Sequence, residues 1–562
     1  MSQSSYIADL LFPNVTATPI DINKRYPPRV LPAGSWVSRF APSPTGFMHI
    51  GGIYAAFIAR TLCHQSGGIF FLRIEDTDKK REVPNGIAGI VESLSALDLM
   101  PDEGIVQANP TPVEQGQYGP YIQSQRVHIY ETFAKDLVAR GLAYPCFCSE
   151  DDLQKMRQQQ EADKVKPGYY GHWAKHRNIT KQEIETHLAH GASFVIRLRA
   201  PDPSHDKINI IDVIRGELQM PANDQDVVLL KSDHLPTYHF AHAVDDSLMH
   251  TNLVIRGDEW MASLPLHVQL FQLLNQPVPH FGHVAPIAKQ EGSSRRKLSK
   301  RKDPEAAVTF YSEHGYPVQA LLEYLLNFAN SDFEEWRVAH PFAPLTEFKL
   351  RTEQMGVSNA LFDLQKLNDV SRNFIARMSA AEVYECVVAW AEHYQPGLVQ
   401  LLRSDKSYSV GMFGIERSGQ KPRKDLAHWS QVEALYNYFF DSLFEELVLA
   451  EDDMPPLSAD KLSAILNGCI QSLEHLQDKE SWLEYLRQFG ESIGFARNTK
   501  TYKKQPDQYE GQFGDLMMVM RIALTKRRTT PDLYELISLM GVDRVKERLQ
   551  NAIRFGLAVR HS

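Results

Sequence analysis

A strand–helix–strand unit near the N-terminus constrains the fold of this chain more than any other segment. The stretch WVSRF (36–40) is typical of a buried strand, and residues 49–66 place apolar side chains at helical spacing until Gly67 and Gly68 end the helix. IFFLRIED (69–76) follows as a second strand. Two strands joined by a helix within about forty residues are expected to be parallel, with a right-handed crossover. The sequence therefore predicts an open parallel sheet.

The length of 562 residues exceeds what one hydrophobic core covers, so we expect several domains. Residues 1–36 are predicted to be an N-terminal extension. Residues 101–235 change to loops, a polar helix and new strands, which indicates an α+β insertion. After it, strand-like LVIRG and amphipathic PLHVQLFQLL repeat the pattern of a buried strand followed by a helix. Residues 37–100 and 236–296 are therefore predicted to form one split, Rossmann-type nucleotide-binding domain.

The second half of the chain is predicted to be helical. SQVEALYNYFFDSLFEEL is expected to be one amphipathic helix that begins at a Ser430–Glu433 capping box. In TPDLYELISLMG, Thr530 is the expected N-cap, Pro531 the first helical residue and Gly541 the C-cap. A helical region without catalytic-looking clusters favours a binding domain.

The net charge and the cysteine content indicate which binding partners and which cellular compartment suit the protein. The net charge of −9 gives no global basic signature for nucleic acid, although a local basic surface would still serve. Five cysteines are few and odd in number, as in a reducing compartment. No long apolar run and no basic, apolar leader occur, so we expect a cytoplasmic protein without a membrane partner.

The segment RFAPSPTGFMHIGG (39–52) combines two prolines, three glycines and His49 at the predicted strand-to-helix turn. A helix N-terminus after a parallel strand suits a phosphate or another anion, and His49 adds a hydrogen-bond donor. The alternative is a tight turn with a packed histidine. The P-loop and dinucleotide-binding patterns are absent from this segment, which weakens those interpretations.

A second segment, SSRRKLSKRKD (293–303), carries six basic residues within eight positions. Such a run is usually a solvated loop. Because Gly292 and two serines precede the basic residues, we expect a mobile loop, which could close on a triphosphate and stabilise the departing pyrophosphate.

Together the two segments resemble the signatures of class I aminoacyl-tRNA synthetases, and within them the bacterial glutamyl-tRNA synthetases. HIGG (49–52) is similar to the first signature and KLSKR (297–301) to the second. The resemblance extends to RFAPSPTG, FLRIEDTD, LPTYHFAHAVDD, LVIRGDEW, VSNALFDLQKLN and RIALTKRRTTPDLYELISLMG. It implies an α/β split catalytic domain with an α+β insertion, followed by an all-α anticodon-binding region.

The resemblance also assigns the predicted domains to parts of a tRNA. Residues 101–235 would hold the acceptor end, 297–370 would contain the KLSKR loop and a stem-contact region, and 371–562 would bind the anticodon. Basic clusters in the helical region that could contact phosphates are KPRK (421–424), KTYKK (500–504) and KRR (526–528), although each alone is more typical of a solvated face.

The same resemblance implies the roles of individual residues. Glu75 would hold the α-ammonium of glutamate, Arg39 and Tyr238 its side-chain carboxylate, and Arg256 a substrate carboxylate. Residues implied in substrate binding are Arg39, Ser43, Glu75, Tyr238, His242 and Arg256. Those implied in ATP binding are Thr45, His49, Gly51, Gly52, Glu259, Trp260, Leu298 and Lys300, and the catalytic ones are His49, Lys297 and Lys300.

Three of these residues also have a structural interpretation, and one position departs from the family pattern. Glu75 could instead cap the turn and pair with Arg73, and Tyr238 and Trp260 could be core residues. His242 stands where the family usually has asparagine, so the resemblance does not carry the family's contact over to this position.

The sequence gives only weak support for a metal site. Cys146 and Cys148 lie where some family members bind structural zinc with a further cysteine and histidine, but the matching positions here hold Trp173 and Lys175. His172 or His176 could substitute only by a shift of register. The sequence therefore predicts no metal site, with reduced cysteines that pack.

The predicted function is ATP-dependent attachment of L-glutamate to tRNA(Glu) through a glutamyl-adenylate, with Mg²⁺, by a monomeric enzyme. Additional charging of tRNA(Gln) stays open. A glutaminyl enzyme would share the fold, but the helical C-terminal half lacks the expected β-barrels. The remaining alternative, a non-catalytic tRNA-binding paralogue, is disfavoured by the intact HIGG and KLSKR segments.

Overall fold

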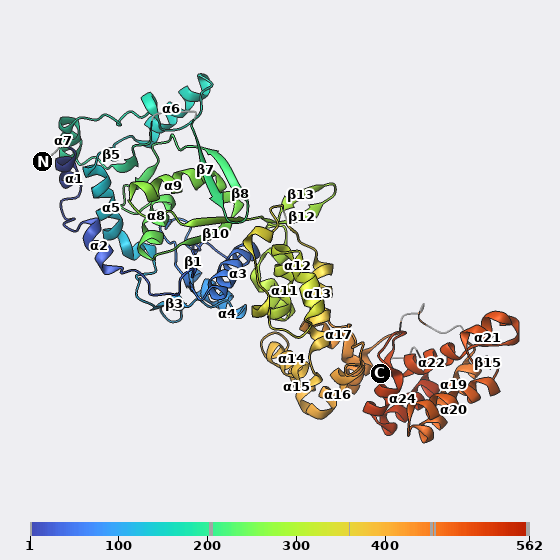
Figure 1. The fold of residues 1–562 in the computed structure, drawn as a ribbon. Helices are drawn as coiled ribbons and strands as arrows, with labels where there is room; N and C mark the ends of the chain where they lie inside the picture. Colours follow the sequence, from blue (N-terminus) through green and yellow to red (C-terminus); the bar gives the residue numbers. More distant parts are fainter. Residues whose placement is uncertain are drawn as a thin grey trace. The chain divides into compact units, whose positions relative to one another are not determined.

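The computed structural model describes residues 3–201, 206–299, 301–358, 360–449, 453 and 457–557. The chain divides into two compact units. The first comprises Met1–Ser312 and Leu322–Asp363, and the second Glu313–Leu321 and Leu364–Ser562. Figure 1 follows the elements of both units along the chain.

The first unit contains most of the strands. They are β1 Val37–Phe40, β2 Ile69–Leu72, β3 Glu103–Gln107, β4 Val113–Gln115, β5 Ala143–Cys146, β6 Val195–Leu198, β7 Lys207–Asp212, β8 Gly216–Pro221, β9 Val228–Leu230, β10 Leu253–Gly257, β11 His280–Val284, β12 Ile287–Glu291, β13 Ser294–Lys297 and β14 Ala360–Leu361. Its helices are α1 Gln3–Leu11, α2 Pro19–Arg25, α3 Ile50–Gln65, α4 Gly86–Ala96, α5 Val127–Ala139, α6 Glu150–Ala162, α7 Lys181–Ala189, α8 Tyr238–Leu248, α9 Leu264–Leu273 and α12 Asp332–Ala339. Helices α10 Val308–His314 and α11 Val318–Ala329 run across the division between the units.

Two sheets form the centre of the first unit, and their strands are mainly parallel. In one, β1, β2 and β3 pair in parallel and β4 is antiparallel. In the other, β10, β11 and β7 are parallel and β8 is antiparallel. Asn252, just before β10, donates its backbone N–H to the carbonyl of Val37, so the sheets meet at β1 and β10, and α3 packs on both strands. The predicted parallel strand–helix–strand unit is confirmed.

Burial explains why this unit forms. Phe70, Phe71 and Leu72 of β2 are fully buried, as are Ile50 and Ile53 of α3. A strand that is apolar on successive residues suits a sheet covered on both faces, as parallel sheets are.

The sheets do not follow the predicted limits of the insertion. Strands β3 and β4 lie within residues 101–235 yet extend the first sheet, and β7 and β8 extend the second. A separate antiparallel sheet of β5, β6 and β9, with α6 and α7, makes up the rest. The change at residue 101 to loop-rich sequence reflects short edge strands and loops rather than the end of the sheet.

The N-terminal segment is folded into the first unit. Helix α1 packs on α5, and the Arg29 guanidinium donates to both carboxylate oxygens of Glu103 at 2.8 and 2.9 Å. Arg29 also lies over the ring of Tyr118, 3.9 Å from its centre. Residues 1–36 therefore contribute to packing, which their composition did not indicate.

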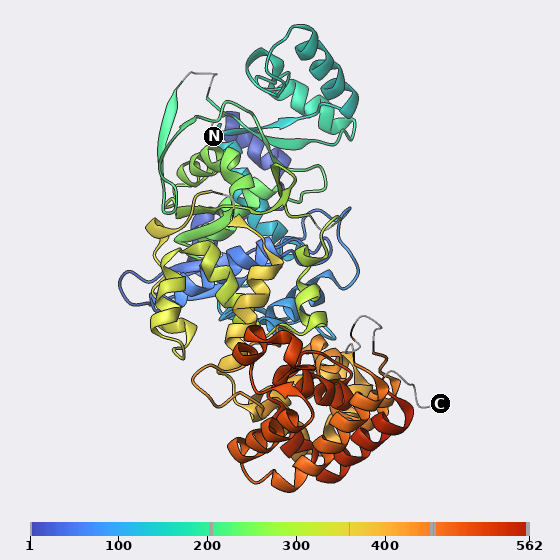
Figure 2. The ribbon, with the colours of Figure 1, turned by 90° about the vertical axis from the view of Figure 1, so that its right-hand side faces the viewer.

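The second unit is helical apart from the short strands β15 Phe495–Ala496 and β16 Gly511–Gln512. Its helices are α13 Leu364–Arg377, α14 Ala380–Tyr394, α15 Pro396–Ser404, α16 Lys406–Gly414, α17 Val432–Tyr436, α18 Asp441–Glu446, α19 Ala459–Ser472, α20 Lys479–Ser492, α21 Thr499–Lys504, α22 Phe513–Thr525, α23 Leu533–Met540 and α24 Val542–Phe555. Helix α19 packs on α20, α22 and α24, and these orange-to-red helices lie side by side in Figures 1 and 2.

Two details of the predicted helices are wrong. The segment 430–447 is not one helix: α17 ends at Tyr436, a 3₁₀ turn follows, and α18 begins at Asp441. Arg548 donates to the carbonyl of Tyr438 and to Asp441, so a tertiary contact replaces the helical hydrogen bonding. Helix α23 begins after Asp532, whose side chain accepts from the Glu535 N–H, rather than after Thr530. The predicted stop at Gly541 is confirmed, with φ +84°.

Within the part of the chain that the structure describes, no helix is long and apolar enough to cross a membrane.

Candidate active site

A cavity of about 1350 Å³ lies at the carboxyl ends of β1 and β10 in the first unit. Its wall also includes the segment between β1 and α3 and the start of α8. This edge of an open α/β sheet is where such folds bind ligands. The predicted site residues on the wall are Arg39, Ser43, Thr45, His49, Gly51, Gly52, Glu75, Tyr238, Arg256, Glu259, Trp260 and Lys297.

Arg39, on β1, is buried and lines the cavity. Its Nε lies 3.1 Å from Asp246 Oδ2, and Nη2 is 3.5 Å from His242 Nδ1. Its Nη1 makes no hydrogen bond among the described residues, so it can still donate to a ligand. The planar guanidinium thus joins the fold and the cavity.

Glu75 and Asp246 share a second buried arginine. Arg73 donates to Asp246 Oδ1 at 2.5 Å and to Glu75 Oε1 at 3.1 Å. Burial raises the pKa of Glu75 to about 7, although Arg73 and Arg39 oppose this rise. Burial also works against the charge of Asp246, but Arg39 and Arg73 outweigh it and hold its pKa well below the ordinary value. The pairing of Glu75 with Arg73 that the sequence left open is therefore present, and Glu75 still lines the cavity.

Arg256, at the end of β10, is held by two imidazoles. Its Nε donates to His283 Nε2 at 2.9 Å, and its Nη1 lies 2.9 Å from His267 Nδ1. Because Asp212 Oδ2 lies 2.6 Å from His283 Nδ1 and can only accept, His283 carries its proton there and offers Nε2 to Arg256. Burial lowers the pKa of His283, although Asp212 opposes this effect, and burial keeps the pKa of His267 well below its ordinary value. Both imidazoles are neutral acceptors that fix the guanidinium.

Aromatic rings form another part of the wall. The Tyr238 and Trp260 rings lie 4.2 Å apart between centres. His242, in contrast, does not line the cavity: it is fully buried one turn further along α8, with Nδ1 2.9 Å from Asp246 Oδ2. Burial lowers the pKa of His242 to about 4, so the ring is neutral and donates from Nδ1 to Asp246. The structure thus connects His242 to the cavity through Asp246 and Arg39.

His49 is the N-cap of α3. Its Nδ1 accepts the Gly51 N–H at 2.9 Å, so the ring proton is on Nε2, which lies 3.2 Å from the carbonyl oxygen of Leu298. A Cβ at Gly51 would lie 3.1 Å from His49 Nδ1, which explains the need for glycine beside the ring. The two signature segments therefore meet in the fold through His49 and Leu298.

The first part of the basic segment 293–303 is a strand of a β-hairpin rather than part of the expected loop. Strands β12 and β13 pair in antiparallel register, and Arg296 donates to both oxygens of Asp303 at 2.5 and 2.8 Å. Lys297 Nζ lies 3.3 Å from Glu259 Oε2 at the cavity. Leu298 is buried and does not line the cavity, and Lys300 lies outside the described residues.

Five residues of this arrangement were not predicted as site residues: Arg73, Asp246, Asp212, His267 and His283. Asp246 had a detectable signal, because two adjacent aspartates on the buried face of α8 need cationic partners. Asp212 and His283 are far apart in sequence, and only the pairing of β7 with β11 brings them together.

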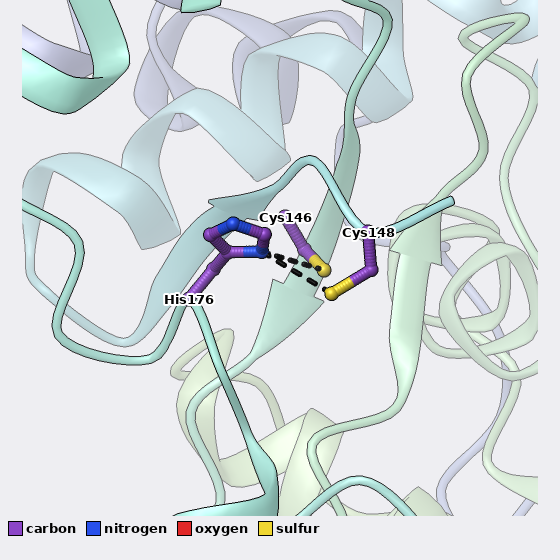
Figure 3. Close-up of side chains that lie close together, drawn as sticks. All are labelled: Cys146, Cys148 and His176. Atoms are coloured by element: carbon purple, nitrogen blue, oxygen red, sulfur yellow. Dashed lines mark hydrogen bonds between the residues drawn. The ribbon is translucent and has the colours of Figure 1, made fainter. Parts of the chain in front are cut away.

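Cys146, Cys148 and His176 form a separate cluster outside the cavity. Cys146 ends β5, and Cys148 comes just before α6. One ligand atom from each of the three residues lies within 4.8 Å of the other two, and Figure 3 shows the imidazole nitrogen facing both sulfur atoms. The prediction of no metal site depended on Trp173 and Lys175, but the fold brings His176 to the two cysteines instead.

Two family models match the chain. One, described as tRNA synthetases class I (E and Q), catalytic domain, matches residues 36–369, and the other, described as anticodon binding domain, matches residues 437–553. The chain belongs to the class I glutamyl- and glutaminyl-tRNA synthetase family. The resemblance drawn from HIGG and KLSKR is confirmed, as is the predicted fold class of a split catalytic domain with a helical anticodon-binding region.

Relatives in this synthetase family match over nearly the whole chain. A glutamate–tRNA ligase of Clostridium perfringens strain 13 is 45% identical over 97% of this chain and 99% of its own length. One from Sorangium cellulosum is 42% identical over 96% of this chain and 99% of its own. The crystal structure of a glutamate tRNA ligase from Elizabethkingia meningosepticum, in complex with its amino acid, has a TM-score of 0.73 at 25% identity, covering 93% of this chain and 99% of that one.

Proposed function

We propose that this synthetase attaches L-glutamate to tRNA(Glu), with ATP, as its Mg²⁺ complex, as the second substrate. The observation that carries the proposal is one wall of the cavity. There two arginines, a buried carboxyl group and two aromatic rings surround the space for an amino acid, beside the cap of α3. The glutamate–tRNA ligases that match this chain over nearly its whole length support the same activity.

In this proposal the wall recognises both ends of glutamate. Arg39 Nη1 and Tyr238 would bind the side-chain carboxylate, with Ser43 nearby, and Arg256 a carboxylate at the other end. The Glu75 carboxyl group, once ionised, would accept hydrogen bonds from the α-ammonium group of glutamate. Because His283 and His267 fix Arg256 and Asp246 fixes Arg39, both guanidiniums are oriented before the substrate arrives.

The reaction would proceed in two steps. The α-carboxylate of glutamate attacks the α-phosphorus of ATP, and the bond to pyrophosphate breaks. The 2′-hydroxyl of the terminal adenosine of tRNA then attacks the glutamyl carbonyl and releases AMP. His49 Nε2–H, Lys297 and Lys300 would stabilise the negative charge that develops on the phosphates, and Thr45, Gly51, Gly52, Glu259 and Trp260 would line the ATP site. Leu298 would act on that site through its carbonyl, which contacts His49.

Pyrophosphate exchange tests the proposal. Enzyme, ATP, glutamate and labelled pyrophosphate should show exchange once tRNA(Glu) is added and little without it, as the resemblance to the bacterial glutamyl enzymes implies. Charging purified tRNA(Glu) and tRNA(Gln) separately with labelled glutamate then defines the specificity. No exchange and no charging with either tRNA would contradict the proposal and favour a non-catalytic tRNA-binding protein.

A further inference from the structure

Asp303, two residues after the KLSKR segment, is a buried carboxylate surrounded by hydrogen-bond donors. It precedes the 3₁₀ helix Pro304–Ala306, and its side chain is 2% exposed. Its Oδ2 accepts from Arg296 Nη1 at 2.5 Å and from the Ser299 N–H at 2.9 Å, and its Oδ1 accepts from Arg296 Nη2 at 2.8 Å. Lys289 Nζ, on β12, lies 3.4 Å from the same Oδ1. These contacts exceed those of an ion pair on a solvated surface, which contributes little.

The partners of Asp303 lie on both sides of Lys297 and Leu298 in the sequence. Arg296 precedes these two residues, and Ser299 follows them. Ser299 is held twice, because its carbonyl also accepts the Asp303 N–H at 2.9 Å. One residue therefore fixes the chain immediately before and immediately after Lys297 and Leu298.

The two residues that are fixed in this way face the candidate active site. Lys297 Nζ lies 3.3 Å from Glu259 at the cavity, and the Leu298 carbonyl lies 3.2 Å from His49 Nε2. They stand at the carboxyl end of β13, an edge strand that pairs with β12 alone in its sheet (Figure 1). Because a short edge strand has few backbone hydrogen bonds, its end depends on other contacts for a defined position.

The segment that carries Asp303 is itself bonded to the HIGG segment. After the 3₁₀ helix, Ala307 forms a backbone bridge with His49, and the Val308 N–H donates to the carbonyl of Met48 at 3.1 Å. Asp303 thus holds the KLSKR segment from a support that belongs to the other signature. The hydrogen bonds from Arg296 also keep the pKa of Asp303 well below its ordinary value, so the carboxylate stays charged at neutral pH.

We propose that Asp303 is a positioning residue for amino-acid activation. It holds Lys297 and the Leu298 carbonyl, and through that carbonyl His49, in the places from which they act on the triphosphate of ATP. Asp303 does not line the cavity, so binding of glutamate by the two arginines of the cavity wall should not depend on it. This inference rests on the proposed ligase activity.

Pyrophosphate exchange in the presence of tRNA(Glu) tests the inference with Asp303→Asn. Both carboxylate oxygens face donors, so an amide in either orientation turns its NH₂ group toward a donor. The maximal exchange rate should fall about 10-fold or more while KM for glutamate stays within about twofold, since misplaced groups cost transition-state stabilisation rather than glutamate binding. Glu291→Gln is the matched control and should change neither, because Glu291 accepts from Arg296 Nε at 2.8 Å on the exposed side of the hairpin.

A double-mutant cycle separates positioning from support of the fold. In Lys297→Ala and in His49→Ala, one of the groups that Asp303 positions is already missing. The fall in exchange rate on adding Asp303→Asn should therefore be smaller in each of these backgrounds than in the wild type.

Hydrogen exchange reports on the segment without any activity measurement. In Asp303→Asn, a peptide that contains Leu298 and Ser299 should exchange about 10-fold faster, because the Ser299 N–H loses a charged acceptor. If Asp303→Asn does not fold, Arg296→Lys takes its place with the same expectations, since lysine keeps the charge but cannot donate two parallel hydrogen bonds.

Three results would overturn the inference: a maximal exchange rate in Asp303→Asn within about twofold of the wild type, an equal fall in all three backgrounds, or unchanged hydrogen exchange at residues 298–299. The second result would mean that Asp303 supports only the fold. Each of them, with an active wild type, leaves the proposed ligase activity standing. A wild type without pyrophosphate exchange would contradict the ligase activity, and this inference with it.

Discussion

Arg39 serves the fold and the site with different nitrogen atoms. Its Nε is paired with Asp246, which also accepts from Arg73, while Nη1 remains for a ligand. Removing Arg39 therefore leaves Asp246 with one cationic partner. This limits the destabilisation, which is severe when a buried charge loses every partner.

We predict that Arg39→Gln lowers kcat/KM for glutamate by about 10²-fold or more while narrowing the preference for glutamate over glutamine. The guanidinium has no acceptor for the amide N–H of glutamine, whereas a glutamine side chain does. Both substrates are measured on one folded preparation, with its melting temperature. Unchanged preference together with a large loss of melting temperature would mean that Arg39 serves only the fold.

Glu75 predicts a pH dependence of glutamate binding. Burial raises its pKa to about 7, so below that pH the carboxyl group is neutral and cannot pair with an ammonium group. Glutamate KM should therefore fall as pH rises from 6 to 8, by up to about 10-fold per pH unit below the pKa. Glu75→Gln should raise KM and remove the dependence. A KM profile that is the same in both proteins would contradict the role of Glu75.

The raised pKa of Glu75 has the opposite effect on the stability of the fold. A carboxyl group with a raised pKa binds its proton more tightly in the folded protein, so ionising Glu75 costs folding free energy as pH rises from about 4.5 to about 7. A group that helps the site above pH 7 thus weakens the fold there, as is common where binding groups are buried.

At the scale of elements, β7 and β11 support the end of β10. Asp212 on β7 fixes the proton of His283 on β11, and His283 then accepts from Arg256 on β10. The order of strands thus places a row of three side chains behind the substrate cavity.

We predict that Asp212→Asn lowers kcat/KM for glutamate by about 10²-fold, mainly through KM, because an amide can donate to His283 and reverse its tautomer, which misplaces Arg256. Asp258→Asn is the control, since Asp258 is a partly exposed aspartate that pairs with Arg215 at 3.5 Å and makes no hydrogen bond or ion pair with His283 among the described residues. Steady-state kinetics and melting temperature are measured for both. If kcat/KM for glutamate is the same in Asp212→Asn and Asp258→Asn, the Asp212–His283 pair does not position Arg256.

At the scale of the whole molecule, an acidic protein must bind an acidic RNA. The net charge is −9, so contacts with tRNA must come from local basic groups. Several predicted basic residues are tied into the fold instead: Arg423 bonds to Tyr436, Lys526 to the carbonyl of Leu557, and Arg527 to Asn437. Lys503 and Lys504 at the end of α21 are exposed.

We therefore predict that changing Lys503 and Lys504 together to Ala weakens tRNA binding and lowers its salt dependence. Each lost phosphate contact to single-stranded RNA should reduce the slope of log K against log salt by about 0.7. Lys406→Ala, an exposed lysine paired with Glu385, is the control. Binding is measured by filter retention over a salt series, and an unchanged slope in the double variant would exclude these lysines as phosphate contacts.

The sequence determined what local pattern can determine. The parallel strand–helix–strand unit, the stop of α23 at Gly541 and the family signatures at HIGG and KLSKR all depend on neighbouring residues, and all are confirmed. Helix periodicity, glycine conformation and short motifs are local properties of a chain, so they can be read without the fold.

Tertiary structure decided everything that depends on distant partners. The break at residues 437–440 follows from Arg548, more than a hundred positions along the chain, and the N-cap of α23 is Asp532 because Thr530 accepts from Arg521 instead. The support of Arg256 by Asp212 and the meeting of His176 with two cysteines arise from strand pairing and loop packing. Spacing in the sequence does not fix spacing in space, because the packing of whole elements sets which side chains meet.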